Sequence, residues 1–194
     1  LPLTFSRRHG DPSRPWNLFS IDIKDKNNHK VLNYQGNWRD IFQNWEALAL
    51  SYPKFLESMI AKFLKCSTAD GYNPYRIFRS GFDWEEQEPH NPWANIGYWG
   101  DHQIIYLLKL LELSKEFNPD SLERLLDNEL FTFANVPYRI KDYQDILKDP
   151  RNTIEFDYKL DERLKADEKL YGSDAKQLKK KDYSLVQVNL MEKL

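Results

Sequence analysis

The sequence predicts an all-α protein of paired helices with one long aromatic-rich loop, and three observations lead to this fold class. Apolar residues recur at spacings of three and four along residues 37–49 and 53–64, as on the buried face of a helix. The run from Ile104 to Leu113 is apolar on nearly all sides. Residues 67–100 have little helical period and many turn-forming residues. We therefore expect at most a short β-hairpin beside the helices.

The first helix is expected to begin near Asn37, an N-cap residue type. Its buried stripe comprises Trp38, Ile41, Phe42, Trp45, Leu48 and Ala49. Pro53 is expected to open the second helix, where proline is favoured. The second stripe comprises Leu56, Met59, Ile60, Phe63 and Leu64. A short turn joins the two helices, which predicts an αα-hairpin.

Irregular segments flank this hairpin. Residues 10–36 are rich in turns, with a possible strand from Leu18 to Ile23, and another short strand is expected from Tyr75 to Phe78. A loop as long as 67–100 is uncommon in a compact domain and is usually functional or disordered. Its aromatic content argues against disorder. We therefore interpret residues 67–100 as a substrate-binding type of loop.

The second half of the chain contains none of the six tryptophans and is predicted to be plain helical scaffold. A helix is expected to start at Pro119, and helical patterns occur around residues 143–147 and 154–171. Leu185 to Leu194 has a helical stripe without a stop signal, and the chain begins without Met. We therefore expect residues 1–194 to be a fragment of a longer chain.

Composition narrows the function classes. A net charge of −2 gives no basis for binding nucleic acid. The longest apolar run is too short to span a membrane, no secretory signal is visible, and the single Cys66 cannot form an internal disulfide. The histidines lack metal-ligand spacing. We therefore expect a cytoplasmic protein with no metal and no cofactor.

The segment NPWANIGYWGDHQIIYLLKLLE, residues 91–112, is the strongest functional candidate. It presents Trp93, Trp99, Asp101 and His102 where a strongly apolar helix begins. Aromatic rings beside a few polar groups suit a sugar, whose C–H faces stack on rings while its hydroxyls need hydrogen-bond partners. Two alternatives stay open: the loop could instead plug a helical core, and the helix macrodipole alone could explain Asp101.

The segment GNWRDIFQNWEAL is the second candidate. Arg39 and Asp40, with Gln43 one turn after Arg39, could bracket neighbouring sugar hydroxyls. Alternatively, Asp40 caps the helix and Arg39 forms a surface ion pair. The acids at 85, 86 and 88 could form a glycosidic pair, but an exposed acidic turn explains them more simply. Cys66 is expected to be a small buried residue.

These two segments resemble the (α/α)6-toroid carbohydrate enzymes, closest to the cellobiose and chitobiose phosphorylases and the debranching-type glucosidases. GNWRDIFQNWEALALSYP is similar to the family segment that holds the sugar on the non-reducing side of the scissile bond, and YWGDHQIIYLLKLLE to one in which an Asp opens an inner barrel helix. The resemblance covers about residues 30–135. It implies that the chain is part of an (α/α)6 toroid, with substrate-binding roles for Arg39, Asp40, Gln43, Trp93, Trp99, Asp101 and His102.

Two departures qualify what the resemblance implies. The family usually has paired Asp where this chain has Asp101 followed by His102, and no Trp-Asn-Asp tripeptide, the family's general-acid motif, is present. The catalytic acid is then expected beyond Leu194, and the fragment alone is expected to be inactive. The predicted function is the substrate-binding portion of a glycoside hydrolase or glycoside phosphorylase-like enzyme acting on glucan-type oligosaccharides. Expected partners are the oligosaccharide, inorganic phosphate in the phosphorylase case and the rest of the parent chain. The alternative is a non-catalytic helical module that binds carbohydrate or protein.

Overall fold

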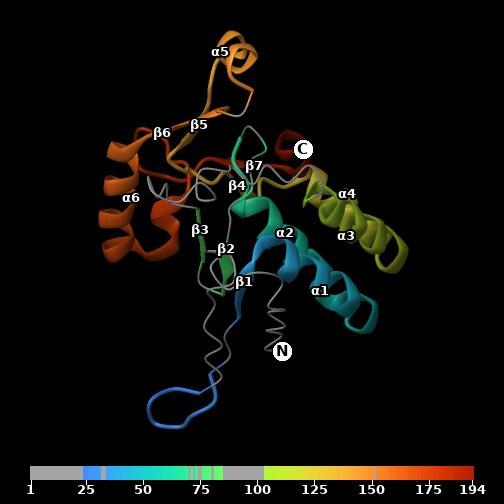
Figure 1. Ribbon diagram of the computed structural model, residues 1–194. Helices are drawn as coiled ribbons and strands as arrows, with labels where there is room; N and C mark the ends of the chain where they lie inside the picture. The colour runs from blue at the N-terminus through green and yellow to red at the C-terminus, as the bar shows by residue number, and fades with distance from the viewer. Residues whose placement is uncertain are drawn as a thin grey trace.

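The computed structural model combines a layer of four helices with three small antiparallel sheets (Figure 1). It describes residues 24–31, 34–69, 71, 73, 76–79, 81–84, 103–150 and 152–194. The possible strand at residues 18–23 lies outside this part of the chain.

The predicted αα-hairpin is present. Helix α1 (Trp38–Ser51) leads through the 3-10 turn η2 (Pro53–Phe55) into α2 (Leu56–Cys66). The rings of Trp38 and Phe63, at the start of α1 and near the end of α2, are 4.7 Å apart, so the two helices are antiparallel. Phe42 lies between them and is fully buried. The stripes read from the sequence are therefore the ones that pack.

A second helical hairpin lies beside the first. Helix α3 (Gln103–Phe117) is followed by α4 (Pro119–Asp127), and α3 contacts α1, α2 and α4. Leu107 and Leu110 are buried, whereas Ile105 and Leu108 are 45% and 54% exposed. Although the run from Ile104 to Leu113 is apolar on nearly all sides, α3 is therefore buried on only part of its surface.

The described strands form three separate sheets. Strands β1 (Gln35–Asn37), β2 (Arg76–Phe78) and β3 (Gly81–Asp83) form a three-stranded meander, in which Ile77 pairs with both Gly36 and Phe82. Residues 76–78 of the strand expected at 75–78 are thus confirmed as β2, whereas Tyr75 lies outside the described residues. Strand β4 (Phe131–Thr132) pairs with β7 (Gln187–Val188), and β5 (Tyr138–Ile140) pairs with β6 (Ile154–Phe156).

Three further helices belong to the C-terminal part. Helix α5 (Tyr143–Lys148) projects with the β5–β6 pair at the top of Figure 1. Helix α6 (Tyr158–Tyr171) is capped by the Asp157 carboxylate, which accepts from the Leu160 amide, and is followed by the 3-10 turn η3 (Gly172–Lys176). Helix α7 (Leu190–Lys193) is a single turn.

The prediction of an all-α fold forming part of an (α/α)6 toroid is wrong, because the described residues form a mixed fold of helices and small antiparallel sheets. Residues 154–156 were expected to be helical but form β6. The stripe expected over 185–194 is split between β7 and α7. Strands of two or three residues are too short to show an alternation of apolar and polar residues. Strands β6 and β7 could therefore not be predicted from the sequence.

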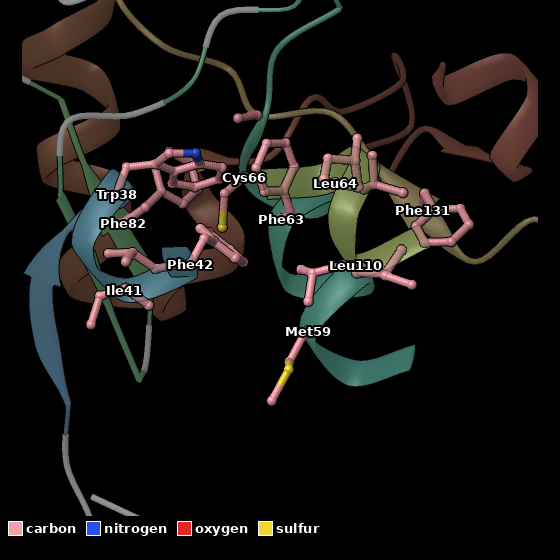
Figure 2. Close-up of a cluster of buried hydrophobic side chains, with 14 of the residues drawn as sticks. Trp38, Ile41, Phe42, Met59, Phe63, Leu64, Cys66, Phe82, Leu110 and Phe131 are labelled. Atoms are coloured by element: carbon pink, nitrogen blue, oxygen red, sulfur yellow. The ribbon is translucent and has the colours of Figure 1, made fainter. Parts of the chain in front are cut away.

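One hydrophobic core joins the helical layer to the sheets. Figure 2 shows Trp38 and Phe82 on one side, Phe42 and Phe63 in the middle, and Phe131 with Leu110 on the other. The buried residues of this core come from α1, α2, α3, α4, α6 and α7 and from β2, β3, β4 and β5. No helix in the described ranges is long and apolar enough to cross a membrane.

Candidate functional site

Most of the predicted site lies outside what the structure describes. Trp93, Trp99, Asp101 and His102 fall outside the described residues. The backbone of Arg39 and Asp40 forms the first turn of α1, but their side chains are likewise not described. Gln43 is described, and its side chain is exposed. The substrate-binding roles expected of these residues therefore stay a prediction.

The helices that carry the two candidate segments are placed side by side. The ammonium of Lys109 on α3 donates to the Glu46 carboxylate on α1 over 2.9 Å. This hydrogen bond raises the pKa of Lys109. The pair is partly exposed, so it contributes little energy. It nevertheless shows that the two helices are direct neighbours at mid-length.

Helices α1 and α3 also run in the same direction (Figure 1). Ser121, near the start of α4, donates to Glu57, near the start of α2, and Arg124, in the last turn of α4, donates to the same carboxylate. Because α2 follows α1 and α4 follows α3 after short connections, the C-terminal ends of α1 and α3 lie at one end of the layer. Their N-termini therefore share the opposite end.

The ion pair also fixes how level the two N-termini are. Glu46 is eight residues after the start of α1, and Lys109 is six after the start of α3. At about 1.5 Å per residue the two starts are level to within about one turn. Packed helices have axes about 8–10 Å apart. The first turns of α1 and α3 are thus close enough for one small sugar to contact both.

Strand β3 lies inside the segment 67–100 that was predicted to be a loop, and a buried ammonium holds it. Lys176, only 2% exposed, donates to Asp83 Oδ1 over 2.7 Å and to the Phe82 carbonyl over 3.0 Å. It also pairs with Glu168 of α6 over 2.8 Å. The end of β3 is therefore tied to α6 and η3.

A second contact holds the residue that follows β3. The indole N–H of Trp84 donates to Asp161 of α6 over 2.9 Å, and both side chains are buried. Sequence reasoning missed this contact and those of Lys176 with Phe82 and Asp83, because each joins residues more than 75 positions apart and no local pattern marks either partner. The second half of the chain, which was predicted to be plain scaffold, thus positions Trp84, the last described residue before the candidate segment 91–112.

Neither Cys66 nor a metal-binding cluster provides a reactive group among the described residues. Cys66 is buried as predicted, and burial raises the pKa of its thiol to about 11. A thiol that stays protonated is a poor nucleophile. Within the described part of the chain, no group of His, Cys, Asp and Glu could hold a metal ion.

Comparison with known proteins adds no relative: no protein-family model matches the chain, and no curated protein is significantly similar to it. The resemblance to carbohydrate enzymes consequently rests on the two sequence segments alone.

Proposed function

We propose that the chain binds a glucan-type oligosaccharide at the end of the helical layer where α1 and α3 begin, as the substrate-binding portion of a glycoside hydrolase or glycoside phosphorylase-like enzyme. The observation that carries the proposal is the parallel packing of α1 and α3. It brings together the starts of two helices whose sequences were singled out independently.

Each residue type has a defined role in this proposal. Asp40 and Asp101 accept hydrogen bonds from sugar hydroxyls, whereas Arg39 and Gln43 donate to them. Trp93 and Trp99 supply stacking faces, and His102 offers a ring nitrogen to a hydroxyl. The exposure of Gln43 supports the proposal, since a buried amide could not reach a ligand. No catalytic role is assigned to these residues.

Binding of cello-, laminari- and malto-oligosaccharides, measured by isothermal titration calorimetry, tests the proposal. Asp40→Asn and Asp101→Asn should each weaken binding about ten- to hundredfold, because a lost hydrogen bond leaving its partner unpaired costs about 1–3 kcal/mol. Asp120→Asn is the matched control, because Asp120 also lies in the first turn of a helix, α4, but at the opposite end of the layer. Variants that bind like the wild type, or no glucan binding at millimolar ligand, would refute the proposal.

The second candidate function is a non-catalytic helical module that binds carbohydrate or protein. The exposure of Ile105 and Leu108 favours it, because exposed apolar helix surface often marks an interaction site. Incubation of the intact parent protein with glucosides, with and without inorganic phosphate, separates the two candidates, because residues 1–194 alone are expected to be inactive in either case. Release of free sugar or sugar phosphate by the parent protein supports the enzyme, whereas binding without turnover supports the module.

A further inference from the structure

A hairpin near the C-terminus presents a tyrosine in an unfavourable backbone conformation. Leu178 and Lys180 pair with Val186 and Ser184, and the Tyr183 amide donates to the Lys180 carbonyl over 3.0 Å. Tyr183 has φ +65°. This is the arrangement of a three-residue hairpin loop that ends in a left-handed residue. Glycine is the usual residue at that position, because a Cβ is strained there.

The side chain of Tyr183 gains nothing from packing. It is 83% exposed, the highest exposure among the large hydrophobic residues that the structure describes. The loop is held by Asp182, whose carboxylate accepts from both the hydroxyl and the amide of Ser184. These hydrogen bonds lower the pKa of Asp182. Fold stability therefore explains the loop but not the tyrosine.

Three lysines come shortly before Tyr183 in the hairpin. They are Lys179, Lys180 and Lys181, and the Lys179 ammonium lies 5.2 Å from the ring of Tyr171, which is 64% exposed. Among the described residues, none of these three lysines forms an ion pair. We call these five residues the lysine–tyrosine surface.

We propose that the lysine–tyrosine surface binds a polysaccharide that carries carboxylates, as a site separate from the starts of α1 and α3. Single ammonium groups pair with isolated carboxylates as point charges, and exposed tyrosine rings stack on sugar faces while their hydroxyls stay hydrogen-bonded. Three lysines are fewer than the six to ten phosphate contacts typical of strong nucleic-acid binding. A lipid membrane is also disfavoured, because its hydrocarbon interior would leave the tyrosine hydroxyls without hydrogen-bond partners.

The test compares polygalacturonate with the same polymer after methyl esterification, which removes the negative charge and keeps the sugar ring. Affinity electrophoresis of the full chain should show retardation by polygalacturonate only, weakening as salt rises. Lys180→Gln/Lys181→Gln should weaken binding at least about tenfold, since both charges are lost. Lys148→Gln on α5 is the control, and its binding should be unchanged.

Tyr183→Gly separates binding from folding. Glycine relieves the left-handed strain, so the melting temperature should stay the same or rise by about 1–3 °C, while binding weakens at least about fivefold through loss of the stacking face. Unchanged binding by Tyr183→Gly overturns the proposal, as does equal binding of the esterified polymer. Preference for single-stranded DNA or for phosphatidylserine vesicles also overturns it. Neutral glucan binding by Tyr183→Gly should remain normal, so failure here is distinguishable from failure of the first proposal.

Discussion

Replacing Lys176 with Met tests whether the buried ammonium holds the two halves of the chain together. Met keeps much of the apolar stem and removes the charge. The variant loses contacts to Asp83, Glu168 and the Phe82 carbonyl at 2.7, 2.8 and 3.0 Å. It also loses the cation–π contact of the ammonium with the Trp84 ring, whose centroid is 5.1 Å away.

The magnitude follows from what is left behind. Removing one partner of a buried ion pair destabilises by about 3–5 kcal/mol. The orphaned carboxylates of Asp83 and Glu168 are 43% and 35% exposed, so water partly compensates them. We therefore expect the lower end, about 3 kcal/mol, which corresponds to a melting temperature lower by about 6–12 °C in a chain of this size.

Urea unfolding followed by tryptophan fluorescence measures this loss. Lys165→Met is the matched control, because Lys165 pairs with Asp161 at 3.0 Å but is 44% exposed, and it should lose only about 0–1 kcal/mol. Buried ion pairs are sometimes replaced by apolar residues without loss. If Lys176→Met unfolds within about 1 kcal/mol of the wild type, the ammonium contacts do not outweigh its desolvation and our reasoning fails.

Three further changes test other parts of the structure. Burial lowers the pKa of Lys193 from 10.5 to about 7, so the unfolded state binds more protons between these values. Wild-type stability should then rise from pH 7 to pH 9, and less so in Lys193→Met, in urea titrations at each pH. Above pH 9 the raised pKa of the Cys66 thiol acts in the opposite direction, because the folded state then binds the additional proton. Trp84→Phe should lose about 1–3 kcal/mol, since the buried Asp161 loses its donor, and a loss below 0.5 kcal/mol by thermal unfolding would contradict that role. Phe42→Ala should lose about 3–5 kcal/mol as a core cavity forms, and a calorimetric loss below about 1 kcal/mol would show that Phe42 is not central to the core.

The helical hairpin could be predicted because its signal is local. In α1 and α2 the buried and partly buried apolar residues are spaced as on one face of a helix, and a helix periodicity is visible within a dozen residues. Pro53 marks the turn between the two helices in sequence and structure alike. In this part of the fold, the residues that become buried can be recognised from the pattern within each helix alone.

The C-terminal half was misread because its order comes from pairing between short segments. Tyr138 and Phe156 face each other across β5 and β6 with ring centroids 5.3 Å apart. Each strand has only three residues, so what stabilises it is its cross-strand partner. The local sequence pattern of so short a strand in a charged region does not differ from that of a helix or a loop.

The candidate site combines both situations. The helix that begins with Trp38 could be located from its own residues, and the structure bears this out. That α3 lies alongside it in the same direction depends on contacts such as Glu46 with Lys109, 63 positions apart. The residues of the proposed site could therefore be selected from the sequence. That they could share one site follows only from the packing of α1 against α3.

The distribution of tryptophan along the chain had indicated a binding half followed by scaffold. Trp84, one of those early tryptophans, is fixed by α6, and the residue before it is fixed by the turn that follows α6. A contact that joins positions 84 and 161 makes the rigidity of one half depend on the presence of the other. The C-terminal residues thus contribute to any function of the aromatic segment through the backbone they hold in place. Lys176→Met should therefore weaken oligosaccharide binding even though Lys176 is too deeply buried to touch a ligand, whereas Lys165→Met should leave binding unchanged.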